Sequence, residues 1–258
     1  GARLVVTMPG RNVASTLRWP VEAVPPGYAD EIILADDGST DDTVAVARSL
    51  GVRVFSHGRN LGYGAGQKTT YREALRAGAD VVVMVHPDFQ YRPELVPAMA
   101  SMVVHGGYDL VLASRMLDGR ARSGGMPIWK LAANRFLTGV ENLMLGAHVS
   151  EYHTGYRAFS KRLLAGLPLA NLSDRFEFDS ELIVLAVLGR YGIGEISCPA
   201  HYFEGMQTMS ATTGLGYGVG CLKAAALGAA SRLGLHRPAI FDPAGPGLLD
   251  GWSEGREA

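Results

Sequence analysis

Polar side chains stand directly after runs of apolar residues, where a folded chain could use them for chemistry. Asp36 and Asp37 follow the apolar run at 31–35 and precede a Gly-Ser turn. Adjacent carboxylates point to different sides of an extended chain, so one could bind a nucleobase or ribose hydroxyls while the other caps the turn. The simpler alternative is that both acids only cap the next helix.

His86 and Asp88 flank a proline after the apolar run at 81–85. Asp88 is a hard oxygen ligand, suited to Mg²⁺ or Mn²⁺ on a diphosphate. His86 could bind a phosphate or supply a nitrogen ligand to the same metal. Taken alone, the two residues are equally compatible with a turn that the aspartate caps.

Arg59, Gly62 and Lys68 belong to a segment in which glycine recurs at every second position. Backbone without side chains can approach a ligand closely, and the two cations suit a phosphate. The pattern is not Gly-x-Gly-x-x-Gly directly after a strand, which argues against a nicotinamide oxidoreductase. A flexible loop with two solvated charges is the alternative.

Acids alternate with bulky residues at 175–181, and a carboxylate there could take a proton from an attacking hydroxyl. Acids in the first turn of a helix would give the same pattern. Further polar candidates in this part of the chain are Arg115, Glu151, His153, Thr154, Gly155, Glu195 and His201.

An alternation of short strands and helices is expected to position these residues. Apolar runs predict strands at 3–8, 31–35, 52–55, 81–85, 109–113 and 193–197. Amphipathic stretches predict helices at 14–24, 39–50, 66–77, 93–104, 129–145, 180–189 and 213–235. This order predicts an α/β fold whose parallel sheet binds ligands beyond the carboxyl ends of its strands. The fully apolar strand at 81–85 is expected to be central and covered on both faces.

The composition excludes several classes of function. The chain has 258 residues with 24 Lys+Arg and 25 Asp+Glu, so no basic excess drives nucleic-acid binding. Two cysteines, Cys198 and Cys221, cannot form a disulfide scaffold or a cysteine-rich zinc site, and a reduced cytoplasmic compartment is the simplest interpretation.

The last quarter of the chain gives two expectations. Residues 213–235 are apolar and rich in glycine, but charged residues interrupt them, so a membrane-spanning helix is not expected. Their small-residue face could pack on the same fold, on a second subunit or on a membrane surface. From residue 236 onward, proline and glycine without periodicity predict a tail that packs little.

Taken in order, these segments resemble the family 2 glycosyltransferases of the GT-A fold. The most specific match is EIILADDGSTDDT at 31–43, which is similar to the family's VDDGSTDDT. The segment at 86–88 occupies the place of the family's D-x-D metal motif, and 109–115 and 154–159 match later motifs. The resemblance spans about residues 3–205 and is nearest to the branch of the dolichol-phosphate mannosyltransferase-like enzymes.

The resemblance implies a Rossmann-like, mostly parallel sheet flanked by helices in one domain at 1–235. A nucleotide-binding half would cover about 1–115 and an acceptor half about 116–235, with a tail at 236–258. The implied activity is inverting, metal-dependent transfer from a UDP- or GDP-sugar to a hydroxyl or phosphate, with Mg²⁺ or Mn²⁺. A polyprenyl phosphate or a soluble metabolite would be the acceptor, in the cytoplasm or at the membrane periphery, and a homodimer is left open.

Positions in the family's motifs assign the site residues that the resemblance implies. The donor nucleotide would contact Pro9, Asn12, Asp36, Asp37, Arg59, Gly62 and Lys68. Asp88 with His86 would hold the metal, and Asp179 or Glu181 would face the acceptor as the base. The donor sugar and acceptor side would include Arg115, Glu151, Thr154 and Gly155.

Three departures from the family pattern leave alternatives open. His86 replaces the leading acid of the metal motif, Glu151 stands where relatives often carry Asp, and 203–206 lacks an arginine that many relatives have. An incomplete metal motif is also compatible with a non-catalytic subunit that binds a nucleotide-sugar. A nucleotidyltransferase on a related sheet is a further alternative.

Overall fold

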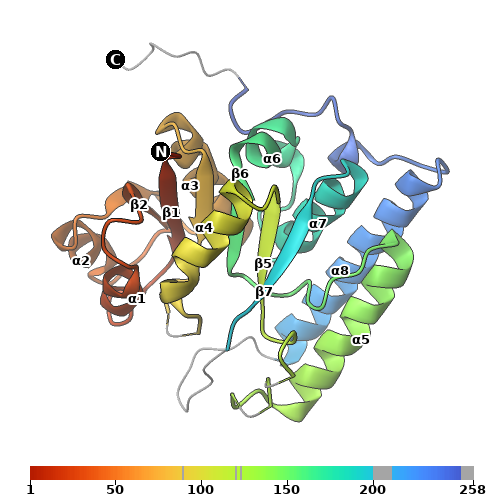
Figure 1. Ribbon diagram of the computed structural model, residues 1–258, viewed down its shortest axis with the longest axis horizontal. Helices are drawn as coiled ribbons and strands as arrows, with labels where there is room; N and C mark the ends of the chain where they lie inside the picture. Colours follow the sequence, from red (N-terminus) through yellow and green to blue (C-terminus); the bar gives the residue numbers. More distant parts are fainter. Residues whose placement is uncertain (89, 120, 123, 200–210, 251–258) are drawn as a thin grey trace.

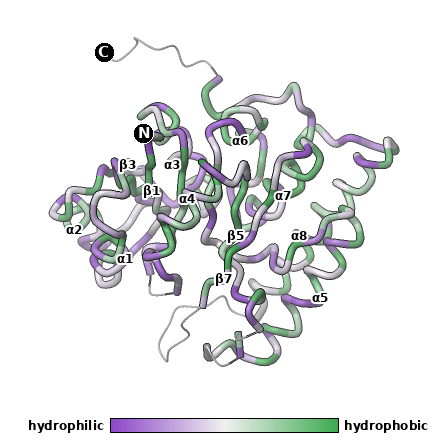
Figure 2. Tube along the Cα trace, viewed as in Figure 1, coloured by the Kyte–Doolittle hydropathy of each residue, from purple (hydrophilic) through white to green (hydrophobic). Residues whose placement is uncertain are grey.

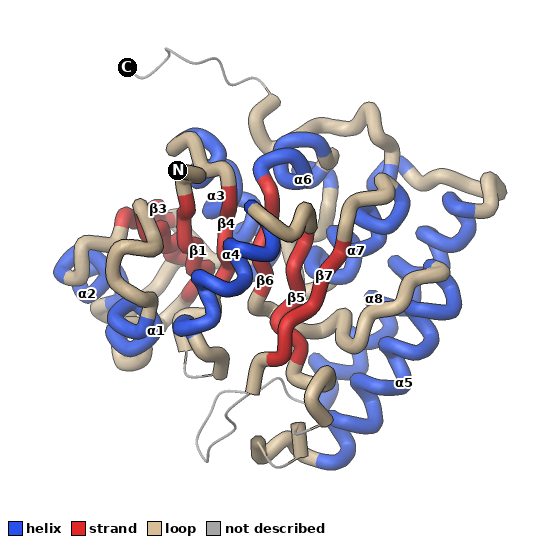
Figure 3. Tube along the Cα trace, in the orientation of Figure 1, coloured by secondary structure: helices blue, strands red, loops and turns tan. Residues whose placement is uncertain are grey.

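The apolar runs form strands, and the strands assemble into one sheet between layers of helices (Figures 1 and 3). The computed structural model describes residues 1–88, 90–119, 121–122, 124–199 and 211–250. The strands are β1 (Leu4–Gly10), β2 (Glu31–Asp36), β3 (Arg53–Ser56), β4 (Val81–Met84), β5 (Leu110–Ser114), β6 (Arg157–Ser160) and β7 (Ile193–Ser197). They lie in the order β3-β2-β1-β4-β6-β5-β7.

The sheet is mostly parallel, as the sequence predicts. Only β6, among the described strands, runs antiparallel to its neighbours β4 and β5. The chain winds from β1 outward through β2 to β3 and then crosses to β4 on the other side of β1. This reversal at β1 and β4 is where open α/β sheets bind ligands, beyond the carboxyl ends of the strands. All of β4 is buried, which confirms its expected central position.

Two layers of helices cover the sheet. The layer on one face contains α1 (Arg18–Ala23), α2 (Thr43–Ser49) and α4 (Val96–Val104). The layer on the other face contains α3 (Tyr63–Arg76), α6 (Lys161–Gly166) and α7 (Phe178–Leu188). Figure 2 shows that hydrophobic residues run along the central strands, where both layers meet the sheet. Short 3₁₀ helices occupy Pro93–Leu95, Leu169–Asn171 and Ala239–Phe241.

Two long helices, α5 (Ile128–Leu145) and α8 (Ala211–Arg232), pack side by side beyond α7 (Figure 1). Cys221, Ala224 and Ala225 of α8 are buried. The expected small-residue face of this helix therefore packs on its own fold, while contact with a second subunit or a membrane stays a prediction. No helix in the described part of the chain has the length and hydrophobicity needed to cross a bilayer.

The structure differs from the sequence-based expectations in several elements. β6 and α6 were not expected, because four residues starting with Arg157 give too short a pattern. The helix expected from residue 66 begins at Tyr63, although its first turn is rich in glycine. The helix expected from residue 14 begins only at Arg18, and α7 begins at Phe178 rather than at about 180.

The expectation that the chain packs little after residue 236 is wrong for residues 236–250. Phe241 and Leu248 are buried in the same core as α6 and α7. These two side chains are enough to attach an irregular segment to the core. Because they follow no helical or strand periodicity, the sequence pattern did not predict their burial. The division of the chain into a domain at 1–235 and a tail stays a prediction.

We predict that Phe241→Ala lowers the free energy of unfolding by about 3–5 kcal/mol, because it leaves a cavity under the C-terminal segment. Urea denaturation followed by circular dichroism measures this change. Leu235→Ala is the control, since its side chain is 77% exposed, and it should change stability by less than about 0.5 kcal/mol. Equal stabilities of the two variants would show that the segment does not contribute to the core.

Candidate functional site

The loops after β1, β2 and β4 meet at one edge of the sheet. The three strands are parallel neighbours, with Gly10 beside Asp36 and Thr7 beside Met84. Their carboxyl ends therefore point the same way, and the loops that leave them lie side by side. The hydroxyl of Thr16 donates a 2.7 Å hydrogen bond to the carbonyl of Pro87, which ties the first loop to the third.

Asp36 and Asn12 brace the turn after β2. The Asp36 carboxylate accepts a 3.1 Å bond from the Ser39 N–H, so Asp36 is the acid that caps the turn. Asn12 has a left-handed backbone (φ 53°), and its side-chain oxygen accepts a 2.8 Å bond from the Thr40 N–H. The predicted nucleotide residues of the first two loops are thus held against one another.

Asp37 organises the glycine-rich loop. Its carboxylate accepts bonds from the N–H groups of Leu61 (2.7 Å) and Gly62 (2.9 Å), and it lies 2.8 Å from Nδ1 of His57. A Cβ on Gly38 would lie 2.7 Å from the carbonyl carbon of Arg59, so only glycine allows this approach. Both Asp37 oxygens have partners within the chain, while the Arg59 side chain is exposed at the same edge.

The first turn of α3 joins the predicted nucleotide half of the chain to the predicted acceptor half. The N–H groups of Gly64 and Ala65 donate to the carbonyl of Asp174, at 2.8 and 3.2 Å. The Lys68 amine donates to the carbonyl of Leu172 at 2.7 Å and pairs with the Asp174 carboxylate at 2.7 Å. These contacts within the chain are enough to explain the position of Lys68. Binding of the nucleotide-sugar by Lys68 stays a prediction.

Tyr63 was not expected from the sequence to take part in the site. Its hydroxyl lies 2.9 Å from Nε2 of His86 and donates a 3.3 Å bond to the Asp179 carboxylate. It therefore connects the predicted metal segment to the predicted base. The one feature of the sequence that could have indicated this role is the position of Tyr63 between two glycines, whose lack of side chains leaves the ring accessible.

His86 is packed among aromatic rings. The ring centroids of Tyr63 and Tyr91 lie 5.6 and 5.5 Å from that of His86. A Cβ on Gly155 would fall 2.0 Å from Nε2 of His86, so glycine at 155 leaves the imidazole its room. Burial lowers the pKa of His86, and the nearby Asp88 only partly offsets this effect, so the neutral ring is favoured.

Asp179 lies in a buried network with Arg157, a residue that the sequence matched to the family motif but gave no role. The guanidinium of Arg157 is fully buried and lies 3.2 Å from the Asp179 carboxylate. Gln67 donates a further 2.9 Å bond to the same carboxylate. Burial lowers the pKa of Arg157, but Asp179 and nearby tyrosines together raise it by more, so the guanidinium stays charged.

The Glu181 carboxylate, like that of Asp179, accepts a hydrogen bond from another residue of the protein. One of its oxygens accepts a 2.7 Å bond from the Ser173 N–H, and burial raises the pKa of Glu181. Both predicted bases therefore have partners within the protein. Their catalytic role stays a prediction, although Asp179 is joined to the sheet edge through Tyr63.

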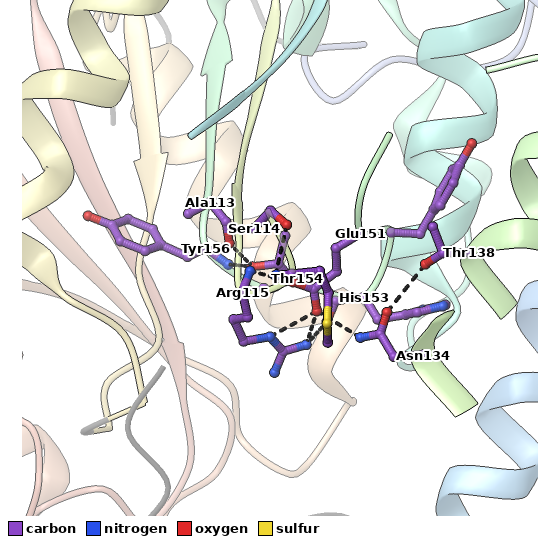
Figure 4. A network of polar contacts seen from close by, with 12 residues as sticks. Ala113, Ser114, Arg115, Asn134, Thr138, Glu151, His153, Thr154 and Tyr156 are labelled. Atoms are coloured by element: carbon purple, nitrogen blue, oxygen red, sulfur yellow. Dashed lines mark hydrogen bonds and ion pairs between the residues drawn. The ribbon is translucent and has the colours of Figure 1, made fainter. Parts of the chain in front are cut away.

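Arg115 and Glu151, both expected on the sugar and acceptor side, form a buried ion pair (Figure 4). The Glu151 carboxylate accepts bonds from the Arg115 N–H (2.7 Å), the Arg115 Nε (2.8 Å) and Asn134 (2.8 Å). Burial raises the pKa of Glu151, but the Arg115 charge and these hydrogen bonds outweigh it, so the pKa lies below its usual value. The pair joins the end of β5 to α5 and to the segment before β6.

Thr154 and Gly155 are held between these two networks. The Thr154 hydroxyl donates a 2.7 Å bond to the carbonyl of Ala113, and the Gly155 N–H donates a 3.0 Å bond to the Tyr91 hydroxyl. Both residues therefore position the segment beside His86.

Asp88 fits a hard divalent cation better than His86 does. The Asp88 carboxylate is half-buried in the loop after β4, and one of its oxygens accepts a 2.9 Å bond from the Gln90 N–H. A partly accessible carboxylate suits Mg²⁺ or Mn²⁺. Nε2 of His86 already faces Tyr63, and metal ligation by His86 stays a prediction. His201 and the segment at 203–206 lie outside the described residues.

Comparisons with known proteins show the family to which the chain belongs. The family model described as Glycosyl transferase family 2 matches residues 10–167. An uncharacterized protein of Methanocaldococcus jannaschii is 33% identical over 69% of this chain and 72% of its own length. The UDP-N-acetylglucosamine–dolichyl-phosphate N-acetylglucosaminyltransferase of Methanococcus voltae is 26% identical over 78% of this chain and 86% of its own.

The fold is also that of solved glycosyltransferases. The structure of glucosyl-3-phosphoglycerate synthase from Mycobacterium tuberculosis with Mn²⁺, UDP and glucosyl-3-phosphoglycerate superposes with a TM-score of 0.61 at 21% identity. The superposition covers 93% of this chain and 82% of the synthase chain. It confirms the expected mostly parallel sheet with flanking helices.

We predict that Gly64→Ala destabilises the protein by about 1–3 kcal/mol, since the new Cβ overpacks the junction between the two halves. That Cβ would lie 2.4 Å from the carbonyl oxygen of Ser173. Gly139→Ala is the matched control, because it is also a helical glycine and its Cβ would meet nothing within 4 Å. Alanine should stabilise that helix by about 1 kcal/mol. Urea denaturation of both variants measures the difference, and equal shifts in the same direction would contradict the close approach.

Proposed function

The chain is a glycosyltransferase of glycosyl transferase family 2, and we propose that it transfers a sugar from a UDP- or GDP-sugar to the phosphate of a polyprenyl lipid, with inversion. The observation that carries this proposal is the meeting of three segments at one sheet edge. These segments are the Asp36–Asp37 turn, the glycine-rich loop that Asp37 holds, and the loop after β4 that carries Asp88.

The first two loops supply the groups that would bind the donor nucleotide. Pro9 lies one residue before the end of β1 and pairs with Ala35, which precedes the Asp36–Asp37 turn, and Asn12 fixes that turn from the neighbouring loop. The exposed Arg59 belongs to the loop after β3, whose backbone lies close to Gly38 of the same turn, and its guanidinium could pair with the diphosphate. A relative with this fold binds UDP, and the Methanococcus relative is named for a UDP-sugar donor, which supports a nucleoside diphosphate here.

Asp88 would hold the divalent cation. Such a cation would neutralise the charge that develops on the departing nucleoside diphosphate. The neutral His86 ring beside Asp88 adds no positive charge that would repel the cation. The Tyr63 hydroxyl contacts both that ring and Asp179, so it would hold the acceptor half in a fixed position relative to the cation.

The state of the candidate bases supports a phosphate acceptor. A hydroxyl acceptor needs a carboxylate to take its proton, whereas a phosphate arrives as an anion and can attack directly. The carboxylates of Asp179 and Glu181 both accept hydrogen bonds from the chain's own donors. The Methanococcus relative is named for transfer to dolichyl phosphate, which is an acceptor of this kind. Direct displacement at the anomeric carbon would invert its configuration.

We predict that UDP or GDP binds and that Mn²⁺ strengthens the binding. In Asp88→Ala the Mn²⁺-linked gain should fall by about tenfold or more, because a ligand to the cation is lost. Isothermal titration with each nucleotide, with and without Mn²⁺, measures the gain. Glu22→Ala is the control for a lost negative charge, since Glu22 is an exposed residue of α1 that pairs with Arg18. Failure of both nucleotides to bind would refute the donor site.

We predict that polyprenyl phosphate accepts the sugar and that the matching polyprenol does not. A screen of radiolabelled UDP- and GDP-sugars with each lipid in detergent, followed by organic extraction, measures the product. Equal transfer to the polyprenol would contradict a phosphate acceptor. Nucleotide binding without donor consumption by either lipid would favour the non-catalytic subunit instead.

A further inference from the structure

A cluster of three buried side chains lies outside the donor edge and takes no part in the proposed transfer. Glu141 of α5, His153 before β6 and Cys221 of α8 each offer one ligand atom, and these atoms lie within 4.8 Å of one another. Glu141 and Cys221 are 1% and 0% exposed. Three different elements of the acceptor half thus contribute one potential metal ligand each.

Two atoms of this cluster face each other without a satisfactory partner. Nε2 of His153 and Oε2 of Glu141 are 3.2 Å apart, yet within the described residues neither has a hydrogen bond. The other ring nitrogen, Nδ1, lies 3.1 Å from the Tyr217 hydroxyl. Histidines that bind metals usually engage their second nitrogen in this way, which fixes the ring and leaves the first nitrogen free.

The spacing fits a tetrahedral ion. Bonds of about 2.0–2.1 Å to nitrogen and oxygen and about 2.3 Å to sulfur place ligand atoms roughly 3.3–3.6 Å apart. The 3.2 Å between Nε2 and Oε2 matches this edge. The ligand atoms of the three residues lie no more than 4.8 Å apart, but the 4.0 Å contact of Cys221 Sγ is with Nδ1 rather than with Nε2, so the thiol has to move toward Nε2 to complete the set.

The charges and donor types select the metal. A carboxylate, a thiolate and a neutral imidazole together carry two negative charges, which one divalent cation balances. Thiolate and imidazole are soft or intermediate donors that favour zinc-like ions over Mg²⁺ and Mn²⁺.

We propose that Glu141, His153 and Cys221 form a second metal site, for Zn²⁺ or an ion of the same class. Water would complete the coordination. The ion would join α5, α8 and the segment that carries Glu151 and Arg157. Cys221 also accepts a 3.0 Å hydrogen bond from Ser180, the residue after Asp179. A metal here would therefore stiffen the acceptor half from a position separate from the Asp88 cation.

Cobalt substitution tests the proposal. The full-length protein is treated with a chelator, dialysed and titrated with Co²⁺, whose thiolate complexes absorb in the near ultraviolet. We expect a thiolate-to-cobalt band that saturates at one Co²⁺ per chain, disappears on adding Zn²⁺ and persists in Asp88→Ala. The band should be absent in Cys221→Ser and weaker in Glu141→Gln. It should persist in Cys198→Ser, which changes the other buried cysteine.

The contrary results are equally specific. Absence of a thiolate band in the wild type, or its persistence in Cys221→Ser, would overturn the site. Circular dichroism of each variant checks that it is folded before titration. Thermal unfolding is the second readout: Zn²⁺ should raise the melting temperature of the chelated wild type and of Cys198→Ser but not of Cys221→Ser. An equal effect on all three would also overturn the proposal.

Discussion

The close approach of α3 to the chain at 173–175 is the constraint on which the rest of the site depends. Two glycines, Gly62 and Gly64, let backbone lie against backbone, and the carbonyl of Asp174 accepts two N–H groups of the first helical turn. This docking places Tyr63 between the halves of the molecule. The Tyr63 hydroxyl then reaches His86 on one side and Asp179 on the other. A side chain at either glycine would push Tyr63 away from His86 and Asp179.

Buried charge on the acceptor side is matched pair by pair. Arg157 lies against Asp179, and Arg115 lies against Glu151. Burying such pairs costs several kcal/mol per ion in desolvation, and good geometry with further hydrogen bonds is needed to offset it. The arginines hold these carboxylates in fixed positions, but they also take up the oxygen atoms that would accept a proton. This occupation is the reason why the proposed acceptor is one that brings its own negative charge rather than one that needs a free base.

Local patterns predicted the strands and the sheet edge at which their loops meet, because the residues concerned are contiguous. The apolar runs before Asp36 and Asp88 specify buried strands, and parallel strands bring the loops at their carboxyl ends to one edge. Family resemblance added Asn12, which the structure places on the same turn. The contacts that the sequence did not reveal join residues far apart in the chain. Tyr63 meets Asp179 across 116 positions, and no local pattern records that contact.

The elements that were wrong or missing also depend on distant partners. β6 has only four residues and begins with Arg157. A charged residue does not predict a buried strand, and Arg157 is buried only because it pairs with the distant Asp179. The first turn of α3 has poor helix propensity, and tertiary contacts with Asp174 outweigh that preference. Phe241 lies in an irregular segment, so its burial depends on the core that α6 and α7 provide.

Crystals soaked with Mn²⁺ and UDP would test the donor site most directly, through anomalous scattering from the manganese. The account predicts an anomalous peak at the Asp88 carboxylate, with the diphosphate beside it and the uridine against the Asp36–Asp37 turn. A nucleotide bound at another face of the sheet, or a manganese peak away from Asp88, would contradict it.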